Sequence, residues 1–106
     1  QLIEQLELAI ITGEYPPGEK IPGVRDLAAQ AQVNPNTMQR ALAELEARGL
    51  LETQRTAGRT VTSDTEKLAQ ARQSLARKLV HDFYRQASAL GLTKAEIAAL
   101  LEQEEA

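Results

Sequence analysis

Hydrophobic residues between positions 24 and 49 repeat with the period of two short helices joined by a turn. In each half the apolar positions follow the i, i+3, i+4, i+7 spacing of a helix with one buried face. The two residues between the halves, Gln32 and Val33, leave room only for a turn. The pattern predicts two amphipathic helices that cross steeply over a short connection. Their buried stripes are Val24, Leu27, Ala28 and Ala31, and then Met38, Ala41, Leu42 and Leu45.

The second helix has clear boundary signals. Asn34 is a strong N-cap residue, and Pro35 suits the first helical position because the N–H that it lacks would be unpaired there. Gly49 follows the last apolar position, where a residue in the left-handed conformation commonly ends a helix. These signals predict a helix that begins at Asn34-Pro35 and stops at Gly49.

The solvent face of this second helix opens with hydrogen-bonding side chains. From Leu27 to Ala43 the chain has no Asp or Glu, and the acids resume at Glu44 and Glu46. Such a face is typical of a recognition helix, whose polar side chains reach base edges or phosphates in the major groove of DNA. On this pattern alone, an ordinary helical pair in a small α domain remains open. The residues expected to face DNA here are Asn36, Thr37, Gln39 and Arg40.

The next segment, LLETQRTAGRTVT, predicts a β-hairpin. Leu50, Leu51 and Val61 flank a polar tip, Thr56-Ala57-Gly58-Arg59, and short Thr- and Leu-rich strands around a Gly-containing turn are typical of hairpins. From Thr53 to Ser63 there are two Arg and no acid, and a basic hairpin directly after a recognition helix is typical of a wing. An ordinary solvated turn is the alternative. The two Arg are Arg55 and Arg59.

The N-terminal residues predict a helix that completes a three-helix core. Leu2, Ile3, Leu6, Ala9 and Ile10 have helical spacing, and Gly13 is expected to stop the helix. Ile21 is expected in a short strand beside the wing. The chain starts without Met inside this helix, so we expect a few native residues before Gln1.

After residue 62 the pattern becomes one long helix and a short one. Ser63 or Asp64 is expected to cap the long helix, Gly91 to end it, and Thr93 to Glu96 forms a capping box for the second helix. Exposed apolar stripes of this length indicate an association surface, and a second copy of the same tail is the expected partner. Folding of the tail back onto its own domain is the alternative. The residues expected at the dimer surface are Leu68, Leu75, Leu79, Phe83, Leu90, Ile97, Leu100 and Leu101.

Composition narrows the possible chemistry. The 106 residues contain no Cys and a single His, His81, so neither a disulfide framework nor a thiolate metal site is possible. We expect no cofactor, no metal and no enzyme activity, because no nucleophile, base or ligand set has suitable spacing. No apolar run reaches membrane-spanning length. The net charge of −3 argues against DNA binding, but the expected contact surface concentrates its arginines, with Asp26 as the adjacent acid.

Several of these stretches together resemble the GntR family of bacterial transcription regulators. The resemblance covers about residues 1–62 and rests on YPPGEKIP at 15–22, VRDLA at 24–28 and VNPNTMQRA at 33–41; the last run, followed by Glu44-Leu45-Glu46 and Gly49-Leu50, is similar to the YtrA-like subfamily. The resemblance implies DNA contacts for Arg25 and for Asn34, Asn36, Thr37, Gln39 and Arg40, and a wing tip at Gly58. Gly23 replaces the family's usual Ser or Thr, and the wing lacks one Gly and the Phe of the usual Gly-x-Gly-Thr-Phe-Val.

The sequence therefore predicts a mainly α fold, with a winged helix-turn-helix at 1–62 and a two-helix dimerisation region at 63–106. The protein is predicted to be a cytoplasmic bacterial repressor that binds a palindromic double-stranded DNA operator as a homodimer. No association with a membrane is expected. A small-molecule effector, if one exists, would bind between protomers because about 43 residues are too few to enclose a pocket. A protein-interaction adaptor that does not bind DNA, and the DNA-binding module of a larger aminotransferase-like regulator, are the alternatives. The predicted DNA-binding residues are Arg25, Asn34, Asn36, Thr37, Gln39, Arg40, Arg55, Gly58, Arg59 and Thr60.

Overall fold

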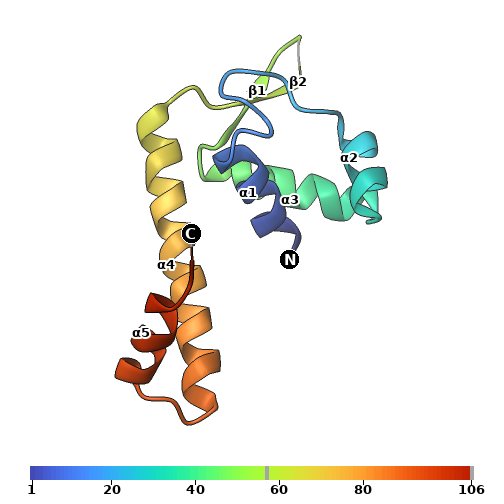
Figure 1. Cartoon of the computed structure of the whole chain (residues 1–106). Coiled ribbons are helices and arrows are strands. Elements are labelled where there is room, and N and C mark those ends of the chain that lie inside the picture. The colour runs from blue at the N-terminus through green and yellow to red at the C-terminus, as the bar shows by residue number, and fades with distance from the viewer. Residues whose placement is uncertain (57, 106) are drawn as a thin grey trace. The chain divides into compact units, whose positions relative to one another are not determined.

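Helices dominate the computed structural model, which describes residues 1–56 and 58–105 (Figure 1). Contacts along the chain divide it into two units, Gln1–Ala71 and Arg72–Ala106. The boundary lies inside the long helix, nine residues beyond the expected division at residue 62. The elements are α1 (Leu2–Ile11), α2 (Val24–Ala31), α3 (Pro35–Ala47), β1 (Leu51–Gln54), β2 (Gly58–Val61), α4 (Thr65–Ala89) and α5 (Lys94–Glu102).

The predicted helix pair is confirmed, and the turn between α2 and α3 shows why it can be so short. Gln32 ends α2 in the left-handed conformation with φ 57°, and it is the one non-glycine residue with positive φ among those described. This residue reverses the chain where glycine is more common. Asn34 then caps α3 by accepting a hydrogen bond at Oδ1 from the Asn36 N–H, at 2.8 Å. Gly49 has φ +81° beyond the end of α3, as expected.

The three helices of the first unit share one apolar core with the hairpin. Met38 of α3 is completely buried, and the cluster to which it belongs has members from all three helices and from both strands. Tight packing of this kind holds α3 rigidly and leaves its opposite side to solvent. The buried members are Leu6, Ile10, Ile21, Leu27, Ala28, Met38, Ala41, Leu42, Leu45, Leu50, Leu51 and Val61.

Strands β1 and β2 form the predicted antiparallel hairpin. Leu51 pairs with Val61 and Gln54 with Gly58, so the connection spans residues 55–57, of which Ala57 lies outside the described residues. A third segment lies beside β2, as expected. Its residue in the bridge to Thr60 is Lys20, whereas the neighbouring Ile21 is buried in the core.

Helix α4 begins in the first unit. Asp64, rather than Ser63, caps it, because Asp64 Oδ1 accepts from the N–H groups of Glu66 and Lys67 at 3.0 and 3.2 Å. Leu68 and Ala71 pack against the core of the first unit, which explains why that unit extends past residue 62.

The second unit consists of the rest of α4 and of α5. Gly91, with φ +90°, follows the end of α4, and Thr93 and Glu96 form both hydrogen bonds of the expected capping box. These signals confirm the two predicted helices. None of the described helices is long and apolar enough to cross a bilayer.

Candidate nucleic-acid interface

Helix α3 presents one polar face that is separated sharply from its buried face. Asn36, Thr37, Gln39 and Arg40 are exposed, although Met38 between them is 0% exposed. The apolar stripe anchors the helix in the core, and the helical period then directs these four side chains outward. The structure therefore brings together the recognition-helix residues that the sequence predicted.

Two further predicted contacts lie at the amino-terminal ends of the helix pair. Arg25 is exposed in the first turn of α2, next to the exposed Asp26. Asn34 is also exposed, but its Oδ1 is already used by the N-cap hydrogen bond. Its amide nitrogen remains as the group that could donate to a phosphate, because an amide has two such hydrogens.

The outward face of α3 continues beyond Arg40 with two small residues that sequence reasoning missed. Ala43 and Ala47 are exposed at positions i+3 and i+7 from Arg40. Small side chains let a helix lie close to its partner, and an alanine methyl can contact the methyl group of thymine. The helical wheel of α3 would have revealed them, because both lie opposite the stripe of Met38 and Leu45.

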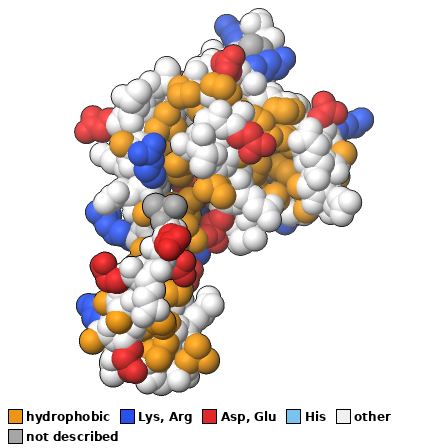
Figure 2. Space-filling view, in the orientation of Figure 1, with side chains coloured by type: hydrophobic (Ala, Val, Ile, Leu, Met, Phe, Trp, Pro, Cys, Tyr) orange, Lys and Arg blue, Asp and Glu red, His pale blue; other side chains and the backbone are white. Residues whose placement is uncertain are grey.

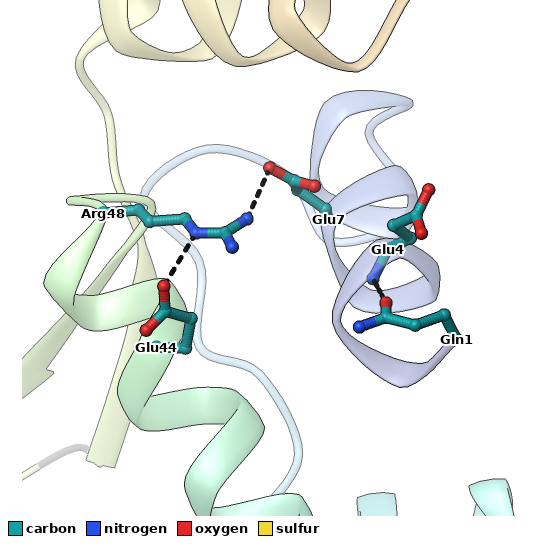
Figure 3. A network of polar contacts seen from close by, with 5 residues as sticks. All are labelled: Gln1, Glu4, Glu7, Glu44 and Arg48. Atoms are coloured by element: carbon teal, nitrogen blue, oxygen red, sulfur yellow. Dashed lines mark hydrogen bonds and ion pairs between the residues drawn. The ribbon is translucent and has the colours of Figure 1, made fainter. Parts of the chain in front are cut away.

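The acids at the carboxyl end of α3 are compensated within the chain. Glu44 Oε1 accepts from Arg48 Nε at 3.2 Å, and Arg48 Nη1 also pairs with Glu7 Oε2 of α1 at 3.3 Å (Figure 3). The Glu7 carboxylate is largely buried. Pairing lowers the repulsion that these acids would otherwise exert on a nearby phosphate backbone.

Glu46, the other acid of α3, joins the helix to the wing. Its Oε2 accepts a hydrogen bond from Thr53 Oγ1 of β1 at 2.6 Å, and its Oε1 pairs with Arg59 Nε of β2. The hydrogen bonds from Thr53 and then from Arg59 lower the pKa of Glu46 below the usual glutamate value. This cluster holds both strands of the hairpin against α3.

The wing residues fall into two groups. Arg55 and Gly58 are exposed, and Thr60 is half-buried with its Oγ1 accepting from Gln54 Nε2 at 3.3 Å. Arg59 was expected on phosphates, but its side chain is 17% exposed and is bound to Glu46. The strand period explains this position, since residue 59 shares its face with the buried Val61.

Lys20 is a wing cation that sequence reasoning missed. It is exposed and lies beside Thr60 through the bridge to β2. Figure 2 shows Lys and Arg side chains gathered at the far end of the hairpin. The expected strand at Ile21 was the available signal, because a buried Ile21 places its neighbour Lys20 on the outer face.

The predicted dimer residues are also divided by their burial. Leu68 packs on the core of the first unit, and Leu75 and Ile97 are buried within the single chain, so these three are less available to a partner. The others remain exposed, with Leu90 at 81%. Figure 2 shows hydrophobic side chains on the visible surface of the second unit. The exposed members are Leu79, Phe83, Leu90, Leu100 and Leu101.

Residues 1–56 and 58–105 hold no group of three or more His, Cys, Asp or Glu side chains arranged to bind a metal ion. His81 is exposed on α4.

Comparison with known proteins identifies the family of the chain. Residues 1–61 match the model of the bacterial regulatory proteins of the gntR family. The chain is 37% identical over 97 residues to the HTH-type transcriptional regulator YhcF of Bacillus subtilis, covering 92% of this chain and 80% of YhcF. It is 38% identical over 66 residues to the HTH-type transcriptional repressor YtrA of the same organism, covering 62% of this chain and 51% of YtrA.

A solved structure agrees with this assignment. The GntR family transcriptional regulator from Listeria monocytogenes superposes with a TM-score of 0.85 at 36% identity, over 99% of this chain and 92% of that one. The similarity includes the winged helix-turn-helix and the helices that follow it. The chain thus belongs to the GntR family of bacterial regulatory proteins and is a transcription regulator, not an enzyme, with a DNA-binding winged helix.

Proposed function

We propose that the protein is a repressor that binds a palindromic DNA operator as a homodimer. The observation that supports this most directly is the face of α3, where four hydrogen-bonding side chains stand exposed around a fully buried Met38. A helix held this firmly can enter a major groove without losing further conformational entropy.

Within this proposal each part of the surface has its own role. Arg40 and Gln39 read base edges, because they carry the paired donors and acceptors that distinguish bases in the major groove. Asn36, Thr37, Asn34 and Arg25 contact phosphates or flanking bases near the start of α3. Arg55 and the wing tip at Gly58 and Thr60 contact the backbone next to the groove, which positions the protein without selecting a sequence.

The exposed apolar residues of the second unit support self-association. Leu79, Phe83 and Leu90 are exposed to water, which is unfavourable for apolar side chains. Contiguous exposed apolar surface commonly marks an interface. A two-fold dimer presents two recognition helices, so the half-sites of its operator would lie about 34–36 Å apart, or a multiple of that spacing. The repressor YtrA, a relative of this chain, supports repression as the outcome.

The same unit is the place where an effector would bind. A surface concavity there is lined by Arg77, Val80, His81, Tyr84 and Lys94, among others, and it is open to solvent. A ligand would therefore need a second protomer to enclose it, as ligand sites bury most of their ligand. Since its operator lies on the bacterial chromosome, we place the protein in the cytoplasm.

Selection from a random duplex pool tests the proposal. The purified protein is expected to enrich one palindromic sequence, and its affinity for that duplex should fall steeply with salt, because phosphate contacts release counterions. Sedimentation of the complex should give two protein chains per duplex. Failure to enrich any sequence, together with salt-independent binding, would overturn the proposal.

A further inference from the structure

We propose that Lys20 makes the phosphate contact beside the wing, and that Arg59 is a positioning residue that holds the wing on α3. The inference rests on the proposed operator binding and assigns different tasks to Lys20 and Arg59. One task is contact with DNA, and the other is contact with Glu46.

Lys20 is held at the hairpin by backbone hydrogen bonds. The Ile21 N–H donates to the Arg59 carbonyl at 3.0 Å, and the Val61 N–H donates to the Glu19 carbonyl at 2.9 Å. These bonds place Lys20 opposite Thr60 in an antiparallel bridge. Residues directly opposite in such a pair have their side chains on the same face, so the Lys20 side chain shares the face of Thr60.

The Lys20 side chain lies against Gly58. Lys20 Cε lies 3.5 Å from the position that a Cβ on Gly58 would occupy. Gly58 also has φ +78°, which favours glycine at this position. The lysine stem therefore lies over the glycine at the start of β2.

Arg59 lies on the other face of β2. Its neighbours there are Thr53, which is its partner in the strand register, and Glu46, which accepts from both side chains. A move of Arg59 to a phosphate would break this ion pair and leave the Glu46 carboxylate with its hydrogen bond from Thr53 alone. Arg59 would lose its ion pair with Glu46 and gain one with a phosphate, so the net gain in affinity for DNA would be small.

The charges around Lys20 leave it available. The ion pairs found among the described residues do not include it, and its side chain is exposed. Glu52 shares this face, because it lies opposite Thr60 in the strand register. It is on β1, however, so β2 separates it from Lys20. Glu19, the adjacent residue, points to the opposite face by the strand period.

The salt dependence of operator affinity tests the division. For the full chain and the duplex selected above, Lys20→Gln is expected to reduce the slope of log affinity against log salt by about 0.9 for each protomer, or roughly two for a dimer. Lys20→Arg should keep the slope of the parent. Lys78→Gln, which removes an exposed lysine from the second unit, is the matched control and should also leave it unchanged.

Arg59→Gln is expected to lower affinity while leaving the slope unchanged, because its effect passes through the position of the wing. The charge exchange Glu46→Arg with Arg59→Glu should restore part of the lost affinity, which a lost phosphate contact would not allow. An unchanged slope in Lys20→Gln, or a reduced slope in Arg59→Gln, would overturn the inference. If the parent itself shows no salt-dependent binding, the proposed function fails instead, so the two failures can be distinguished.

Discussion

The two units of this chain differ in how far their large hydrophobic side chains are buried. Of the eight large hydrophobic residues that are exposed in the described chain, Leu8 lies in the first unit and the other seven lie in the second. The largest fully buried side chains, Met38, Leu42, Leu45 and Val61, all lie in the first unit. The first unit therefore has the core of an independent domain, whereas the helices of the second leave many of their large apolar side chains exposed.

The comparison teaches that the two units gain stability from different sources. The first unit buries its apolar surface by tertiary folding, at about 25 cal/mol for each Å² removed from water. The second has strong local signals, such as the capping box at Thr93, but local signals contribute only about 1 kcal/mol each. Its helices would gain most from association with a second copy.

The largest expected effect comes from damaging the core of the first unit. Leu45→Ala should lower the free energy of unfolding by about 2–5 kcal/mol, because Leu45 is fully buried and its truncation leaves a cavity. Urea unfolding measures this change. Leu90→Ala, in the second unit, is the matched control, and equal losses from the two variants would contradict the contrast between the units.

A charge on the exposed stripe of α4 should act on association instead. Leu79→Asp is expected to raise the dissociation constant of the dimer by about 30-fold or more, since a central apolar residue contributes roughly 2 kcal/mol or more to an interface. Sedimentation at several concentrations gives the mass. Ser74→Asp, which adds the same charge on the opposite side of α4, should remain dimeric; dimers in both variants would exclude this stripe as the interface.

The recognition face can be altered without disturbing either unit. Arg40→Ala should lower affinity for the selected duplex by about 1–3 kcal/mol and relax the choice of base at one position in each half-site. Urea unfolding should be unchanged, because Arg40 is exposed. The matched control is Arg85→Ala, which removes an exposed Arg from the second unit; if Arg40→Ala binds every duplex as the parent does, Arg40 does not read a base.

The smallest expected effect is the pH dependence of the contact between α3 and the wing. The folded protein lowers the pKa of Glu46, so the contact stabilises the fold above the unfolded glutamate pKa of about 4.3 and is lost as pH falls through the lower folded value. Glu46→Gln should therefore cost less than about 1 kcal/mol near neutral pH. Urea unfolding of both proteins should show this difference shrinking toward zero in acid; a growing difference would have the wrong sign.

Much of the fold follows from rules that act over a few residues. The period of the apolar positions, the cap at Asn34 and the glycines at 49 and 91 were enough to place α2, α3 and α4 close to their observed bounds. The exposed polar residues of α3 were predictable for the same reason, since the helical period alone decides which side chains oppose a buried stripe. The predicted DNA contacts themselves remain proposals.

The sequence by itself determined the helices, the hairpin and the face of α3, because each depends on neighbours within one or two turns. Only the tertiary structure decided which cations of the wing are free. Lys20 reaches Thr60 across 40 positions, and Arg59 reaches Glu46 on another element. No local period encodes such contacts, since they exist only after the core has brought the segment at Lys20, the hairpin and α3 together.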